Sequence, residues 1–117
     1  MRVGKEIIEH IKVAEYLRHK KIPFYHFANE GKRGYQNASL LRKMGFRAGV
    51  SDLFMPRHNL QYSGLWIELK TITGVVSPSQ KEFLETMIEE GYAGCVAYGA
   101  DEAISIIDQF YEIDCEL

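Results

Sequence analysis

The feature that most limits the fold of this chain is a helix start, Ser-Pro-Ser-Gln, at residues 77–80. Its first residue is a preferred N-cap, its Pro takes the first helical position, and its Gln can complete a capping box. The predicted helix runs to about Glu90, before a glycine. Apolar segments at 65–70 and 93–98 flank it and have the character of strands. Strands that alternate with helices indicate an α/β fold.

The remaining elements follow from hydrophobic spacing and from turn residues. Apolar residues at helical spacing predict helices, and short apolar runs between Gly, Pro and Asn residues predict strands. The elements expected in chain order are a helix at 4–20, a strand at 22–28, a helix at 37–44, strands at 50–55 and 65–70, the helix from 77, a strand at 93–98 and a helix at 101–110. We therefore predict one domain, 1–117, with a mixed sheet of about four strands flanked by helices.

Length and composition exclude several classes of protein. The chain has 117 residues, of which 46% are hydrophobic, as in an ordinary globular domain. No run approaches the roughly 18 apolar residues of a membrane span, and the charged first 20 residues lack a signal-peptide core. Cys95 and Cys115 form no zinc-binding pattern. We expect a cytoplasmic protein without a disulfide framework.

Charge is distributed very unevenly along the sequence. All 14 Lys and Arg lie in 1–81, whereas 82–117 contains ten acids and no Lys or Arg. Such a basic part can attract phosphate while the acidic part turns away, although solvated faces without a partner explain it equally well. The densest basic stretch comprises Lys32, Arg33, Arg42, Lys43, Arg47 and Arg57. We predict that these residues contact DNA phosphates and give affinity without base specificity.

Two acids and a lysine on the middle strands carry the most information about function. The segment Gly-Val-Ser-Asp-Leu at 49–53 puts Asp52 at the start of a predicted strand. After a hairpin loop, Leu-Trp-Ile-Glu-Leu-Lys at 65–70 places Glu68 and Lys70 two residues apart. Alternate residues of a strand share a face, so Glu68 and Lys70 lie together. If the two strands pair as a hairpin, Asp52 reaches the same face.

This arrangement suits a hard divalent cation. Two carboxylates bind Mg²⁺ well, with Mn²⁺ as an alternative, and the carbonyl of Leu69 is a candidate third ligand. Such a metal lowers the pKa of bound water, and Lys70 beside it orients that water or neutralises a phosphate. An isolated Glu-x-Lys pair is more often a surface ion pair. Here the strand is otherwise strongly apolar, which places the pair next to a covered core.

Five marks occur in one order along nearly the whole chain. They are Glu6 on a predicted helix, a loop at 29–31, the segments 45–53 and 64–70, and the turn at 77–80. In this order they resemble the VRR-NUC (virus-type replication-repair nuclease) branch of the PD-(D/E)xK nucleases. The resemblance implies a restriction-endonuclease-like core and a metal-dependent endonuclease that cuts branched DNA, such as four-way (Holliday) junctions or flaps. The short length resembles compact phage-type members, which implies a phage or its bacterial host as the source.

The resemblance also assigns roles to single residues. It implies that Asp52 and Glu68 bind the metal and that Lys70 is the catalytic lysine. Gln80 would contact the metal's water or a phosphate, in addition to its capping role. Glu6 would complete the metal shell through water, although a solvated position on the helix is equally compatible.

Some alternatives stay open at this level. Glu9, about one turn further along the helix, competes with Glu6 for the same role. His10 stands where the family often has Gln, and we favour a surface position for it over a polar contact. Ser51 stands where many members of the wider superfamily have Pro before the acid, a change that affects only the backbone.

The resemblance further implies a homodimer whose two sites cut opposing strands. Tyr62, Leu65 and the last helix are candidate contributors to that interface. Two other functions compete with the nuclease. One is a DNA-binding accessory module that kept the fold without cleaving DNA, and the other is a small interaction protein with no nucleic-acid role.

Overall fold

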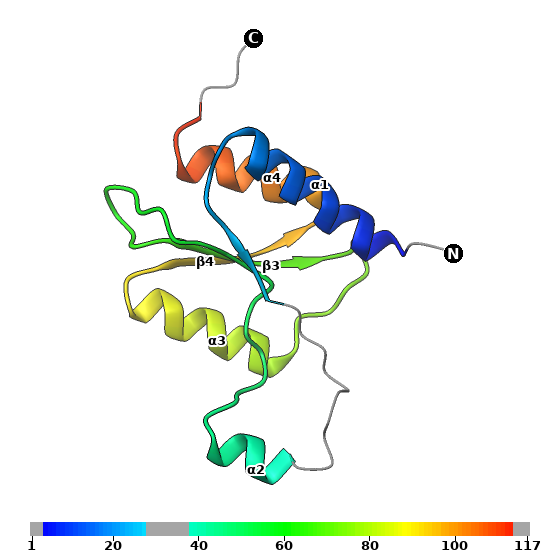
Figure 1. Cartoon of the computed structure of the whole chain (residues 1–117), viewed down its shortest axis with the longest axis vertical. Coiled ribbons are helices and arrows are strands. Elements are labelled where there is room, and N and C mark those ends of the chain that lie inside the picture. The colour runs from blue at the N-terminus through cyan, green and yellow to red at the C-terminus, as the bar shows by residue number, and fades with distance from the viewer. Residues whose placement is uncertain (1–3, 28–37, 114–117) are drawn as a thin grey trace.

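A computed structural model describes residues 4–27 and 38–113 and contains the predicted order of elements (Figure 1). The helices and strands are α1 (Lys5–His19), β1 (Tyr25–His26), α2 (Ala38–Lys43), β2 (Leu53–Met55), β3 (Leu65–Lys70), α3 (Pro78–Glu89), β4 (Ala93–Tyr98) and α4 (Ala100–Phe110). The α/β fold with a mixed four-stranded sheet is therefore confirmed.

The sheet has the strand order β1-β2-β3-β4. β1 and β3 both pair with β2 in antiparallel orientation, and β4 pairs with β3 in parallel orientation. The hairpin register places Phe54 opposite Trp66 and Leu53 opposite Ile67. Residues of β2 and β3 that lie opposite one another share a face, so this register decides which side chains meet.

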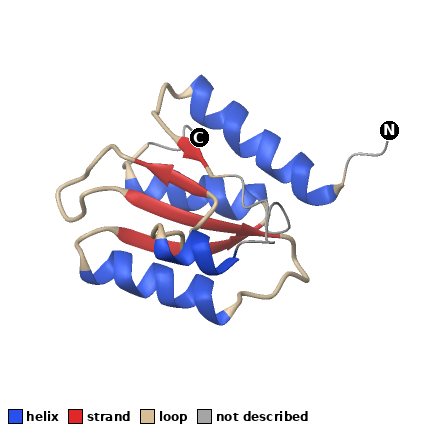
Figure 2. Cartoon of the chain, turned by 60° about the horizontal axis from the view of Figure 1, so that its bottom comes forward, coloured by secondary structure: helices blue, strands red, loops and turns tan. Residues whose placement is uncertain are grey.

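Helices cover both faces of the sheet (Figure 2). α1 and α4 contribute to the core together with one face of β2, β3 and β4. α3 packs on the opposite face of β3 and β4. The core consists of Val13, Leu17, Ile22, Leu53, Met55, Leu65, Ile67, Leu69, Ala97, Ala100, Ala103 and Ile107. Its β3 members are alternate residues, which leaves the other β3 face to polar and aromatic side chains.

Two polar contacts join α1 to α4. The Tyr16 hydroxyl donates to the Asp108 carboxylate. The Glu9 carboxylate accepts a hydrogen bond of 2.8 Å from the backbone N–H of Ala100, the first residue of α4. A helix N-terminus has unpaired N–H groups and a partial positive charge, so Glu9 caps α4 from outside.

Two strands are shorter than the sequence predicts. The strand expected at 22–28 is reduced to Tyr25–His26, because the N–H of Ile22 closes the end of α1 on Leu17 and Pro23 has no N–H to offer. The strand expected at 50–55 begins only at Leu53, after a turn that packs against α3.

α2 differs from the other helices because none of its residues is buried. In Figure 1 it stands away from the sheet, beyond α3. The molecule measures 53 × 40 × 24 Å along its principal axes. Within the described part of the chain, no helix is long and apolar enough to cross a membrane.

Candidate active site

β3 carries the acid and the lysine on its α3 side, as its alternation predicts. Leu65, Ile67 and Leu69 are at most 1% exposed and face the core. Glu68 and Lys70 lie on the other face, with Lys70 Nζ 3.4 Å from Glu68 Oε2. The Glu68 residue is only 3% exposed, so this is a covered pair and not the exposed ion pair that an isolated Glu-x-Lys pattern suggests.

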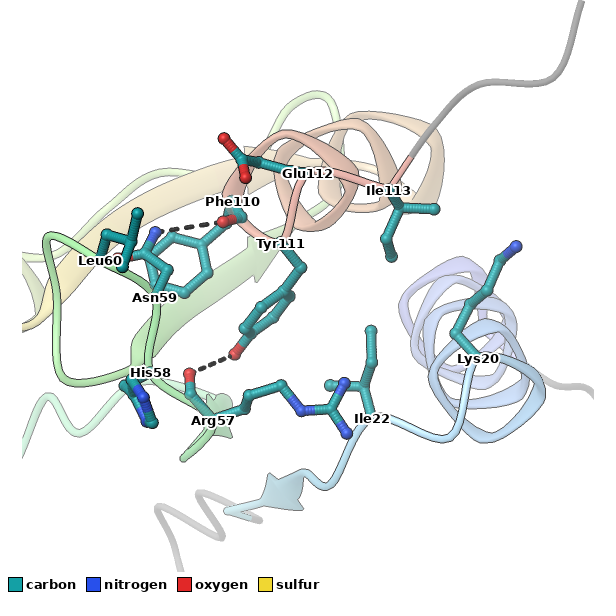
Figure 3. Close-up of a pocket in the computed structure, with 10 residues that line it drawn as sticks. All are labelled: Lys20, Ile22, Arg57, His58, Asn59, Leu60, Phe110, Tyr111, Glu112 and Ile113. Carbon is teal, nitrogen blue, oxygen red and sulfur yellow. Dashed lines mark hydrogen bonds between the residues drawn. The ribbon is translucent and has the colours of Figure 1, made fainter.

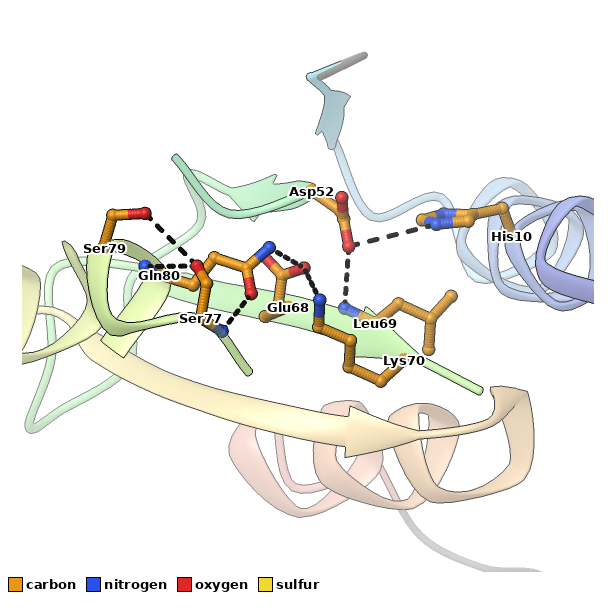
Figure 4. A network of polar contacts seen from close by, with 8 residues as sticks. All are labelled: His10, Asp52, Glu68, Leu69, Lys70, Ser77, Ser79 and Gln80. Carbon is orange, nitrogen blue, oxygen red and sulfur yellow. Dashed lines mark hydrogen bonds and ion pairs between the residues drawn. The ribbon is translucent and has the colours of Figure 1, made fainter. Parts of the chain in front are cut away.

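Asp52 reaches the same place from just before β2. Its Oδ2 accepts a hydrogen bond of 2.9 Å from the backbone N–H of Leu69, which fixes the carboxylate at the end of the β2–β3 seam (Figure 4). The turn that carries it is tightly packed. Gly49 has φ +91°, and a Cβ there would lie 2.3 Å from the carbonyl oxygen of Ser79. Glycine therefore lets this turn lie directly on the start of α3.

Gln80 has the predicted capping role and also contacts Glu68. Its Oε1 accepts from the N–H of Ser77 at 2.9 Å, and its own N–H donates to the Ser77 hydroxyl, which completes the capping box. Its Nε2 donates to Glu68 Oε2 at 3.1 Å. The capping box therefore orients the amide that holds Glu68.

Glu68 is the most perturbed acid of the site. Burial is the largest cause that raises its pKa, the charge of Asp52 adds to it and Lys70 opposes both, and together they bring this pKa to about 7. Among the described residues, no donor reaches its buried Oε1. A carboxylate oxygen without a partner, beside a second carboxylate, is a costly arrangement unless a cation or a proton completes it.

The surface position favoured for His10 is wrong. Its side chain is largely buried, with Nε2 3.9 Å from Asp52 Oδ2, and its ring stacks on His26 at 4.6 Å. Burial lowers the pKa of His10, and the charge of Asp52 partly opposes this. The Nδ1 atom of His10 is buried and has no hydrogen-bond partner within residues 4–27 and 38–113. Sequence spacing could not reveal this contact, because it depends on β1 bringing His26 beneath α1.

The choice between Glu6 and Glu9 is narrowed by what each carboxylate contacts. Glu9 is held by the α4 N-terminus and by Lys12 Nζ at 3.4 Å, and both contacts lower its pKa. Glu6 is exposed on α1, close enough for its charge to raise the pKa of His10. The Glu9 carboxylate is therefore occupied by contacts within the fold, and Glu6 stays the candidate of α1 for the site.

The donor atoms fit a divalent cation that keeps part of its water shell. Within residues 4–27 and 38–113, no three His, Cys, Asp or Glu side chains form a metal cage by themselves. Mg²⁺ needs only one or two carboxylates because it retains several waters. Asp52 and Glu68 supply these, and Glu68 has a free, buried oxygen. The Leu69 carbonyl faces the same neighbouring strand as its N–H, which points at Asp52.

The predicted basic residues lie in different places. Lys32 and Arg33 fall outside the described residues, as does the loop at 29–31. Arg42 and Lys43 are exposed on α2, and exposed Arg47 lies 3.6 Å from Glu82. The structure does not bring these side chains and Arg57 into one patch.

Arg57 lies at the opposite end of the sheet from the carboxylates. It lines a cavity of about 430 Å³ between the end of α1, the hairpin loop and the end of α4 (Figure 3). Its guanidinium donates to the carbonyl of Lys21 at 3.0 Å and lies over the ring of Tyr111. This arginine thus joins three segments of the fold.

Comparisons with known proteins agree with this geometry. The model of the VRR-NUC domain family matches residues 6–101. A solved structure described as a VRR_NUC domain protein superposes with a TM-score of 0.79 and 27% identity, over 97% of this chain and 93% of that one. No curated protein matches the chain significantly in sequence.

Proposed function

The chain belongs to the VRR-NUC family of nuclease domains, and from this premise we propose that it is a metal-dependent, structure-selective DNA endonuclease. One observation carries the proposal. A buried, unpartnered oxygen of Glu68 lies beside Asp52, with Lys70 and Gln80 in contact with the same carboxylate. A cation bound between the two carboxylates would complete this oxygen, which no donor of the described residues reaches.

Each side chain of the site has a task that follows from its contacts. Asp52 and Glu68, with the carbonyl of Leu69, would hold Mg²⁺ or Mn²⁺. Such an ion would lower the pKa of a bound water and stabilise charge on the phosphate. Lys70, held at 3.4 Å from Glu68, directs its ammonium toward the attacking water or a phosphate oxygen. Gln80 fixes the Glu68 oxygen that Lys70 also contacts.

Two residues of α1 act around this centre. His10 contacts Asp52 and restricts its orientation, while Glu6 would contact the metal shell through water. Both belong to the helix that the Glu9 contact fastens to α4. The packing of α1 against α4 thus determines where His10 and Glu6 lie relative to the carboxylates.

The substrate we propose is branched DNA, a four-way junction or a flap. Exposed Arg42, Lys43 and Arg47 supply phosphate contacts that read shape and charge and no base sequence. Two copies of the chain would present two sites to opposing strands.

The proposed dimer interface differs from the one suggested by the sequence. Leu65 is 1% exposed and lies in the core, so its assignment to an interface is wrong. The Tyr62 ring stacks on Phe110 of its own chain. Three isoleucines of α1, in contrast, are between 41% and 54% exposed, and we place the interface there: Ile7, Ile8 and Ile11.

A substrate panel tests this proposal. Labelled single strands, duplexes, flaps and four-way junctions are incubated with the protein and Mg²⁺, Mn²⁺ or a chelator. We expect cleavage of the branched substrates only with metal, and its loss in Lys70→Met, which keeps the length of the side chain. Binding of junctions without cleavage under either metal would instead assign the chain to the DNA-binding accessory modules.

A further inference from the structure

A row of aromatic rings crosses the sheet face that carries Glu68 and Lys70. Phe54 stacks on Trp66 at 4.3 Å between ring centroids, and Phe27 also stacks on Trp66, at 5.7 Å. Phe83 of α3 contacts the edge of the Trp66 ring at 4.9 Å. Trp66 is therefore the covered centre of a row that continues outward to the edge strand.

The outer end of this row is open. Tyr25 is 60% exposed and Phe27 is 42% exposed. Tyr25 lies opposite Phe54 in the β1–β2 ladder, so its ring stands on the same face of the sheet. α3 packs on β3 and β4, whereas the main contacts of β1 with the other described elements are those with β2. Aromatic side chains on a sheet edge offer rigid, flat contact area at little cost in side-chain entropy.

The row begins at the proposed metal site. The backbone N–H of Phe27 donates to the carbonyl of Asp52 at 2.8 Å. Trp66 precedes Glu68 by two residues on the same face, a separation of about 7 Å along the strand. A ligand that spans both features needs a phosphate at one end and a flat apolar group at the other.

A nucleotide has this combination, and we propose that Tyr25 and Phe27 form a stacking platform for an unpaired nucleobase of the strand being cut. The inference rests on the proposed nuclease function and deepens it. Bases stack on aromatic side chains whatever their sequence. A paired duplex keeps its bases in its own stack, so the platform favours DNA with unpaired nucleotides next to the scissile phosphate.

Binding without cleavage tests the platform. A labelled oligothymidylate and a matched hairpin duplex are titrated in chelator, and affinity is read from fluorescence anisotropy. We expect Tyr25→Leu and Phe27→Leu to weaken binding of the single strand about tenfold, within the range for loss of one stacked base. Tyr62→Leu removes an aromatic ring at the far end of the sheet and should leave the affinity unchanged.

Trp66 provides a local reporter, because it is the one tryptophan of the chain. Oligothymidylate should change its emission in the wild-type protein and in Tyr62→Leu. Equal single-strand affinity in all four proteins would overturn the platform. Reduced self-association of Phe27→Leu with unchanged DNA affinity would assign this face to a second copy of the chain and would also overturn it.

Cleavage separates this inference from the proposed function. If the wild-type protein cuts no DNA with Mg²⁺ or Mn²⁺, the nuclease proposal fails. If it cuts, the ratio of flap to duplex cleavage should fall about tenfold in Phe27→Leu, by the same loss of stacking. An unchanged ratio would refute the platform and leave the nuclease proposal intact.

Discussion

The two ends of the sheet use polar groups in opposite ways. At the hairpin end, polar atoms pair with one another: the Tyr111 hydroxyl donates to the Arg57 carbonyl at 2.8 Å, and the Asn59 amide donates to the Phe110 carbonyl at 3.1 Å. At the other end, Glu68 Oε1 and His10 Nδ1 are buried and have no hydrogen-bond partner in the described part of the chain. Satisfied groups stabilise a fold, whereas unsatisfied ones mark a place where a ligand completes the structure.

The largest effect on cleavage should come from a near-isosteric change at the end of the sheet that carries Glu68 and His10, which we call the unsatisfied end. Glu68→Gln keeps the shape of the side chain but removes the charge that holds a cation. We expect single-turnover cleavage of a four-way junction to fall roughly 10²–10³-fold, comparable with the loss of one electrostatic stabiliser of a transition state. Circular dichroism checks that the variant is folded. Activity within a few-fold of wild type would contradict the view that the unsatisfied end of the sheet binds a ligand needed for cleavage.

A smaller effect should separate the two roles of Gln80. Gln80→Glu preserves the capping box, because a carboxylate also accepts from the Ser77 N–H. It removes the N–H that donates to Glu68. We expect thermal stability close to wild type and a loss of roughly 10- to 100-fold in cleavage, as for other residues that orient metal ligands. Loss of stability with full activity would show that capping is its only role.

The opposite pattern should appear at the hairpin end. Tyr111→Phe removes the hydroxyl that donates to Arg57 and leaves the ring in place. We expect the free energy of unfolding to fall by about 1 kcal/mol, measured by urea denaturation, and cleavage to stay unchanged. A matched loss of activity would mean that the two ends are coupled.

The smallest effect is a difference in pH dependence. The folded state raises the pKa of Glu68 from 4.5 to about 7, so between these values it holds a proton that the unfolded chain has released. In metal-free protein this group stabilises the fold below about pH 4.5, and that contribution is lost as pH rises through 7. His10 has a lowered pKa and acts in the opposite direction. We expect urea denaturation to show that the stability of Glu68→Gln falls less than that of the wild-type protein between pH 4.5 and 7. If the stabilities of the two proteins changed in parallel with pH, the expectation would be contradicted.

The sequence predicts the fold well because most of its signals are local. The capping box at 77–80, the alternation at 65–70 and the order of elements all appear in the structure. The contacts among Glu68, Lys70 and Gln80 follow from strand parity and from one helix start.

The parts that the sequence missed depend on distant packing. Asp52 lies in a turn and not in a strand, because Gly49 lets the chain rest against α3. His10 is buried because β1 places His26 beneath it. Arg57 contacts Lys21 and Tyr111 at the hairpin end, and its place in a basic stretch does not predict these contacts. None of these contacts has a fixed spacing that periodicity could reveal.

The central claim is that the unsatisfied end of the sheet binds a divalent cation through Asp52 and Glu68. The most direct test measures Mn²⁺ binding from the electron paramagnetic resonance signal of the unbound ion. It compares the wild-type protein with Asp52→Asn, Glu68→Gln and Tyr111→Phe. We predict that wild type and Tyr111→Phe bind Mn²⁺ alike and that the two site variants lose about tenfold or more in affinity. Equal Mn²⁺ binding by all four proteins would contradict the claim.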